Sequence, residues 1–223
     1  MRKIIAYAMC VLLSSAGAAG TTIPTQEMKR VQANLGVGCH IAMILPQSTT
    51  SRIGNGGDPS FGEGSLRVEP LPKSWKSHMG ALYFGLDCPN ANDLQATKLA
   101  RFDESLQLWI KDLDARFGEM TPYDRKILDK ATRLFNIQAA NSKGYAIYVD
   151  DTTGDEDKRE RHMQFCLLHP PKALCGGGTV AQIVDGRPKG DLTKQALEII
   201  KSIEFLDDAP PAPPSAAASV PAK

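Results

Sequence analysis

Cysteines are the residues of this chain most suited to covalent chemistry, and there are five. Cys10 lies in an apolar N-terminal run, and we expect it to leave with a signal peptide. The other four cysteines are an even number, which predicts two disulfides formed in an oxidising compartment. A zinc site that adds His40 or His169 is the alternative, although no CxxC or HxxxH spacing supports it. The remaining four are Cys39, Cys88, Cys166 and Cys175.

The spacing of two of these cysteines predicts the pairing. The chain between them reads CLLHPPKALC, and a hairpin centred between Pro170 and Pro171 places Cys166 directly opposite Cys175. Opposed Cα atoms in antiparallel strands are about 4.5 or 5.5 Å apart. A disulfide tolerates about 4.4–6.8 Å. We therefore predict Cys166–Cys175, and elimination then gives Cys39–Cys88.

An acidic turn, Asp150–Asp157, offers the clustered oxygens that calcium prefers. Its glycine falls at the wrong offset for an EF-hand loop, because Val149 would occupy the first ligand position. The basic residues within 158–161 follow at once and neutralise the acids locally. We therefore predict a solvated hairpin turn and no metal site or cofactor, and keep calcium binding as an alternative.

Neither phosphate chemistry nor nucleophilic catalysis has its usual sequence pattern here. Gly54-Asn55-Gly56-Gly57 continues into Asp58-Pro59 rather than into the Lys-Ser/Thr pair of a phosphate loop. There is no G-x-S-x-G elbow, and oxidised cysteines supply no nucleophile. The four histidines are scattered, which favours structural or surface roles: His40, His78, His162 and His169. The sequence thus predicts a protein without catalytic residues.

Contact residues for a partner protein are expected at three places. Trp75 lies in a loop rich in Pro, Lys and Ser, where an exposed aromatic ring would suit an interface. Asp58 belongs to the glycine-rich loop that precedes it, and loops often carry binding residues. The charged turn supplies the other candidates: Asp151, Asp155, Arg159 and Arg161.

The N-terminus and the overall charge predict the compartment and exclude some partners. Arg2 and Lys3, an apolar run to Leu13 and a small-residue site predict a signal peptide over 1–20. We expect a periplasmic protein, or alternatively a secreted one, with no transmembrane segment after cleavage. Lys and Arg number 26 against 25 Asp and Glu, so no basic face for nucleic acid is expected.

Apolar periodicity predicts one α+β domain over 21–206, in which an antiparallel sheet packs against helices, followed by a disordered Pro/Ala-rich tail over 207–223. The clearest helix is expected at Asp93–Phe117, from a stripe of large apolar residues spaced three to five apart. It would pair with a helix from Thr121 to Phe135, and both would lie over the sheet.

Shorter patterns predict the remaining elements. A helix is expected up to Leu35. The three glycines 176–178 should break the chain, and a last helix should be capped by Asp191. Its inward side would consist of Leu192, Ala196, Ile199, Ile200 and Ile203. The expected strands are Cys39–Leu45, Leu66–Val68, His78–Leu86, Tyr145–Val149, His162–Leu168 and Thr179–Val184.

The order of these elements resembles a known envelope fold. A strand ending in proline (HIAMILPQ), a helical middle, three strand segments (GYAIYV, RHMQFCLL, TVAQIV) and a closing ALEIIKSIEF are similar to the PsbP-like fold, including the DcrB-like proteins, over roughly residues 39–205. The resemblance implies an antiparallel sheet packed against helices and a role in binding or assembly. By analogy, envelope proteins of this make-up include immunity proteins that neutralise toxins of the type VI secretion system.

These observations lead to three hypotheses of different classes. The first is a non-enzymatic periplasmic domain that binds another envelope protein, such as a toxin, in an immunity or accessory role of a secretion system. The second is a small-ligand or calcium-binding envelope protein that uses the acidic turn. The third is a hydrolase with an unrecognised site.

Overall fold

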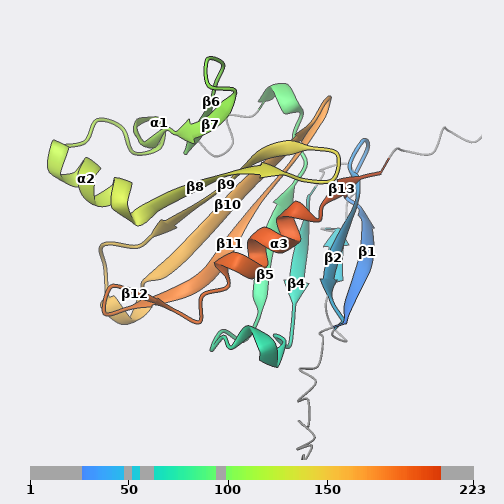
Figure 1. Cartoon of the computed structure of the whole chain (residues 1–223), viewed down its shortest axis with the longest axis horizontal. Helices are drawn as coiled ribbons and strands as arrows, with labels where there is room; N and C mark the ends of the chain where they lie inside the picture. The colour runs from blue at the N-terminus through green and yellow to red at the C-terminus, as the bar shows by residue number, and fades with distance from the viewer. Residues whose placement is uncertain (1–26, 48–51, 56–62, 94–98, 207–223) are drawn as a thin grey trace, which may run out of the picture.

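A large antiparallel sheet forms the centre of the protein in the computed structural model, which describes residues 27–47, 52–55, 63–93 and 99–206 (Figure 1). Its strand order is β3-β4-β5-β11-β10-β9-β8, and β12 (Arg187–Lys189) pairs with the end of β11. The ordered strands are β3 (Arg52–Asn55), β4 (Glu63–Val68), β5 (Leu82–Asp87), β11 (Lys172–Val184), β10 (Glu160–His169), β9 (Lys143–Asp150) and β8 (Thr132–Gln138).

The central hairpin of this sheet confirms the predicted cysteine pairing. Cys166 of β10 lies opposite Cys175 of β11, and the two are joined by a disulfide with their Cα atoms 4.0 Å apart. The hairpin turns between Pro170 and Pro171, as the sequence predicted. The second disulfide, Cys39–Cys88, is also confirmed.

One face of the large sheet is covered by α3 and by a small sheet. α3 (Thr193–Lys201) lies across the large sheet in Figure 1, beside the strands β1 (Met28–Asn34), β2 (His40–Pro46) and β13 (Glu204–Phe205). These elements and the inner face of the sheet share the main hydrophobic core, in which Phe84 and Phe165 are fully buried. Cys39–Cys88 joins the start of β2 to the end of β5, so it links the two sheets.

The opposite face carries a second, smaller core. Covering it are α1 (Leu113–Phe117), α2 (Pro122–Ala131) and the hairpin β6 (Ala100–Asp103) and β7 (Leu108–Lys111). Trp109 packs on Tyr145 with ring centroids 4.7 Å apart, and the Cys166–Cys175 disulfide belongs to this cluster. The large sheet is therefore the middle layer of three.

The predicted α+β fold with a long central helix pair is wrong, because strands dominate the described residues. The described part of the expected helix Asp93–Phe117 contains β6, β7 and the short α1. Phe102 and Trp109 are cross-strand partners, so a seven-residue spacing that suits one side of a helix also places them on one side of a hairpin. Asp103 favours the turn, since its Oδ1 accepts from the N–H groups of Ser105 and Leu106.

The second predicted helix begins correctly and ends too late. Thr121 caps α2 through its side chain, which accepts from the N–H of Asp124, and Pro122 follows in the first turn. At Thr132 the backbone becomes extended and β8 begins. Along β8, Leu134 packs into the second core while Ile137 lies in the main core. This alternation shows why a strand is the stable form.

Two further predictions were wrong. Residues 28–34 form the strand β1 rather than a helix, and every residue of β1 pairs with β2. Glycines 176–178 do not break the chain but lie within β11. A Cβ at Gly178 would lie 1.9 Å from the carbonyl oxygen of Tyr83, so glycine permits close approach of β5 here.

The last helix and the remaining short elements complete the described chain. The N-cap residue of α3 is Leu192 rather than Asp191, although Asp191 Oδ1 accepts from the N–H of Thr193. All five predicted inward residues are buried. Three single-turn 3₁₀ helices are η1 (Lys73–Trp75), η2 (Ala91–Asp93) and η3 (Glu156–Lys158). The expected signal peptide, the tail and Asp58 lie outside the described residues.

Within the described ranges, no helix combines the length and the apolar character needed to cross a membrane.

Candidate functional site

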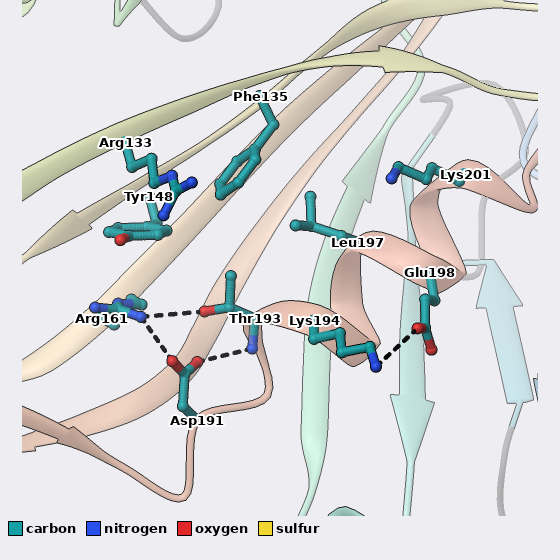
Figure 2. A pocket seen from close by; sticks show the side chains of 10 residues that line it. All are labelled: Arg133, Phe135, Tyr148, Arg161, Asp191, Thr193, Lys194, Leu197, Glu198 and Lys201. Atoms are coloured by element: carbon teal, nitrogen blue, oxygen red, sulfur yellow. Dashed lines mark hydrogen bonds and ion pairs between the residues drawn. The ribbon is translucent and has the colours of Figure 1, made fainter.

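A cleft of about 440 Å³ separates α3 from the strands β8, β9 and β10; we call it the α3 cleft (Figure 2). Its sheet side is formed by Arg133, Phe135, Tyr148 and Arg161. The helix side begins with Asp191 and continues through Thr193, Lys194, Leu197, Glu198 and Lys201.

Strand and helix periodicity decide which side chains reach the cleft. Arg133 and Phe135 are two residues apart on β8, so they point to the same face of the sheet. On α3, Thr193, Leu197 and Lys201 are four residues apart and lie along one side of the helix. Leu197 also packs against the main core, which fixes how closely the helix approaches the strands.

The floor of the cleft is a network around the buried guanidinium of Arg161. Its Nε and Nη2 donate to the two carboxylate oxygens of Asp150, over 2.6 and 2.9 Å. Its Nη1 donates to Asp191 Oδ2 over 2.8 Å and to Thr193 Oγ1 over 3.4 Å. The guanidinium also lies 3.9 Å from the ring centroid of Tyr148, a cation–π contact.

The charge state of Arg161 follows from these contacts. Burial by itself would lower its pKa, but the hydrogen bonds and charge of Asp150, with the charge of Asp191, outweigh burial and raise the pKa. Arg161 is therefore a permanent, compensated cation. Because Asp150 belongs to β9 and Asp191 precedes α3, the network fixes the helix to the sheet.

The rim of the cleft carries charges that are less compensated. Lys194 pairs with Glu198 over 3.9 Å. The guanidinium carbon of Arg133 lies 5.2 Å from the centroid of the Phe135 ring, which is a cation–π contact. Neither Arg133 nor Lys201 forms an ion pair with any of the described residues. The cleft thus combines an apolar centre with two exposed, uncompensated cations.

The predicted contact residues do not form one surface. Of the described ones, only Arg161 lines the α3 cleft, and there it is buried. Asp151 accepts from the N–H of Glu160, and Asp155 pairs with Lys158. The remaining two also have local contacts, since Arg159 donates to the carbonyl oxygen of Gly154 and Trp75 packs, half-buried, against the main core.

The four histidines lie apart from the α3 cleft. His40 begins β2, and His78 lies between η1 and β5. His169 stacks on Phe205 at 4.6 Å between ring centroids. His162 lies 3.5 Å from Asp151 and lines a separate hollow of about 380 Å³ on the opposite face of the sheet. Among the described residues, no group of three or more His, Cys, Asp or Glu side chains is placed to hold a metal ion.

Sequence reasoning missed most of the cleft, including Arg133, Tyr148 and Lys201. The detectable signal was the alternation of Arg133, Phe135 and Ile137 against Leu134 and Asn136 on the other side, which is the pattern of a two-sided strand. Pairing of that strand with β9 then brings Arg133 beside Tyr148, its cross-strand partner.

No protein-family model matches the chain, and no curated protein or solved structure matches it either.

Proposed function

We propose that the protein is a non-enzymatic binding domain of the bacterial envelope and that another protein occupies its α3 cleft. The observation that carries the proposal is the contrast between floor and rim. Arg161 is fully engaged with Asp150 and Asp191, which makes the floor rigid. Arg133 and Lys201 are exposed and lack carboxylate partners among the described residues, so they are available to a ligand.

The compartment is part of this proposal. The two disulfides support an oxidising environment, where such bonds persist. The basic, apolar and small-residue order of the first twenty residues is typical of a signal peptide, which supports export to the periplasm. The immunity or accessory role, which analogy with other envelope proteins suggests, is the narrower form of the same proposal.

Little in the described residues favours calcium binding by the acidic turn. Asp150 holds Arg161, Asp151 accepts from a backbone N–H, and Asp155 pairs with Lys158. These oxygens are directed to partners within the protein rather than toward a common point. Protein binding is therefore the function that the geometry supports best.

Site-specific photo-crosslinking in the periplasm tests the proposal. The photo-reactive amino acid p-benzoylphenylalanine would replace the exposed Lys194 at the rim of the cleft, and in a matched control it would replace the exposed Lys126 on α2. We expect a discrete protein adduct from position 194 that is absent from position 126. Failure to form any protein adduct at position 194, in cells that produce the exported chain, would contradict the proposal.

A further inference from the structure

We infer that the α3 cleft recognises an extended acidic segment of its partner, in which two carboxylates flank an apolar side chain. This inference rests on the proposed function and specifies the chemistry of the partner. It follows from the charges left over in the cleft, from the apolar surface between them and from the length of the cleft.

The cations of the cleft are unequally compensated. Arg161 is paired with two carboxylates, so these three residues together carry a net charge of −1, and Lys194 has Glu198 as its partner. The two remaining cations are Arg133 on the sheet side and Lys201 in the last turn of α3. A ligand that pairs with both of these exposed cations brings two negative charges, one for each side of the cleft.

The surface between these two cations is apolar. In Figure 2, the ring of Phe135 and the side chain of Leu197 lie between Arg133 and Lys201 and face the open cleft. Both are half-buried, so they present apolar surface that a ligand can remove from water. A ligand that is charged throughout would leave this surface unused, which is why we place an apolar side chain at its centre.

The length of the cleft favours a polypeptide over a small anion. The helix side of the cleft extends from Thr193 to Lys201, and eight residues of α-helix rise about 12 Å. In an extended chain, side chains that point the same way recur every two residues, about 6.6 Å apart. Three such side chains, acidic, apolar and acidic, span about 13 Å, so a cleft of this length can accommodate them. A small anion would reach one exposed cation, and a single exposed ion pair contributes little to binding.

Synthetic peptides and a charge exchange test the inference with the full exported chain. The probe is a fluorescent peptide with the core Glu-Ser-Phe-Ser-Glu, measured by anisotropy, beside the same peptide with Gln or Lys in place of Glu. We expect the Glu peptide to bind at least tenfold more tightly than the Gln peptide. Arg133→Glu combined with Lys201→Glu should reverse the preference, so that the Lys peptide binds more tightly than the Glu peptide. Lys126→Glu on α2 is the matched control and should change neither affinity.

The possible outcomes separate this inference from the proposed function. Equal binding of the Glu and Gln peptides, no binding of the Glu peptide, or an unchanged preference in the double variant would overturn the inference. Binding of succinate as tight as that of the Glu peptide would also overturn it, because a small dianion would then suffice. A protein adduct at position 194 together with any of these results would leave the proposed function standing. All of the substituted side chains are exposed, and equal unfolding midpoints would verify that the variants fold.

Discussion

Arg161 donates to Asp191 over 2.8 Å, and this ion pair joins the middle of the large sheet to the start of α3. A second carboxylate, that of Asp150, accepts from Nε and Nη2 of the same guanidinium. The helix that forms one wall of the α3 cleft is thereby fixed relative to the strands that form the other. Stability and cleft geometry therefore depend on the same three residues.

Breaking this network should destabilise the protein unequally. Asp150→Ala leaves the buried Arg161 without its two-oxygen partner, and we expect the free energy of unfolding to fall by about 3 kcal/mol. Asp191→Ala should cost about 1–2 kcal/mol, because Asp191 is more exposed. Urea unfolding followed by circular dichroism measures both. Asp155→Ala, which breaks an exposed pair, is the control and should change stability by no more than about 0.5 kcal/mol. Equal effects of all three would contradict the network.

The two disulfides should contribute unequally because they close loops of different length. Cys166 and Cys175 are 9 residues apart and Cys39 and Cys88 are 49 apart. From the chain entropy of loop closure, replacing the first pair by alanine should cost about 2.7 kcal/mol and the second about 4 kcal/mol. Unfolding midpoints of the two double variants test the order. A larger loss from the shorter loop would show that packing in the second core, rather than chain entropy, dominates.

Close strand packing predicts a difference between two glycines on neighbouring strands. Gly178→Ala would place its Cβ against the Tyr83 carbonyl oxygen, and we expect the free energy of unfolding to fall by about 2 kcal/mol or more. Gly85→Ala is the matched control, because nothing lies within 4 Å of a Cβ built there. Its stability should stay within about 1 kcal/mol of the parent protein. Thermal unfolding of both variants distinguishes the two sites, and similar losses would refute the close approach.

Asp87 should make stability depend on pH. Partial desolvation raises the pKa of its exposed carboxyl, and Glu63, its cross-strand partner on β4, raises it further, while a hydrogen bond from the backbone of Cys88 opposes both. Because the folded state then binds the proton more tightly than the unfolded state, stability falls as the pH rises from the ordinary value of 3.8 through the raised pKa.

Asp87→Asn removes this dependence, so we expect the variant to be more stable than the parent at pH 7 and the difference to close at acidic pH. Urea unfolding between pH 3 and pH 7 measures the difference. Glu63→Gln in the parent protein should weaken the pH dependence of stability, since it removes the repulsion between the carboxylates of Glu63 and Asp87. A variant that is less stable than the parent at neutral pH would show that the carboxylate is stabilising instead.

The sequence alone determined the features that depend on local chemistry. The ten-residue segment CLLHPPKALC fixes a hairpin whose cysteines face each other, because antiparallel register follows from where the chain turns. The start of α2 was also predicted correctly. The Thr121 side chain accepts a hydrogen bond from an N–H group of the first turn, and Pro122 has no N–H group that needs a partner. The buried side of α3 followed from its periodicity, and all of these were confirmed.

Only the tertiary structure decided the middle of the chain and the α3 cleft. Phe102 and Trp109 are spaced for a helix, but they lie opposite each other in a hairpin whose second strand packs Trp109 on Tyr145. Arg133 meets Tyr148 only because residues 132–138 join the edge of the sheet as a strand, and Lys201 reaches the cleft because Arg161 binds Asp191. Such contacts join residues far apart in the sequence, and spacing along the chain does not encode them.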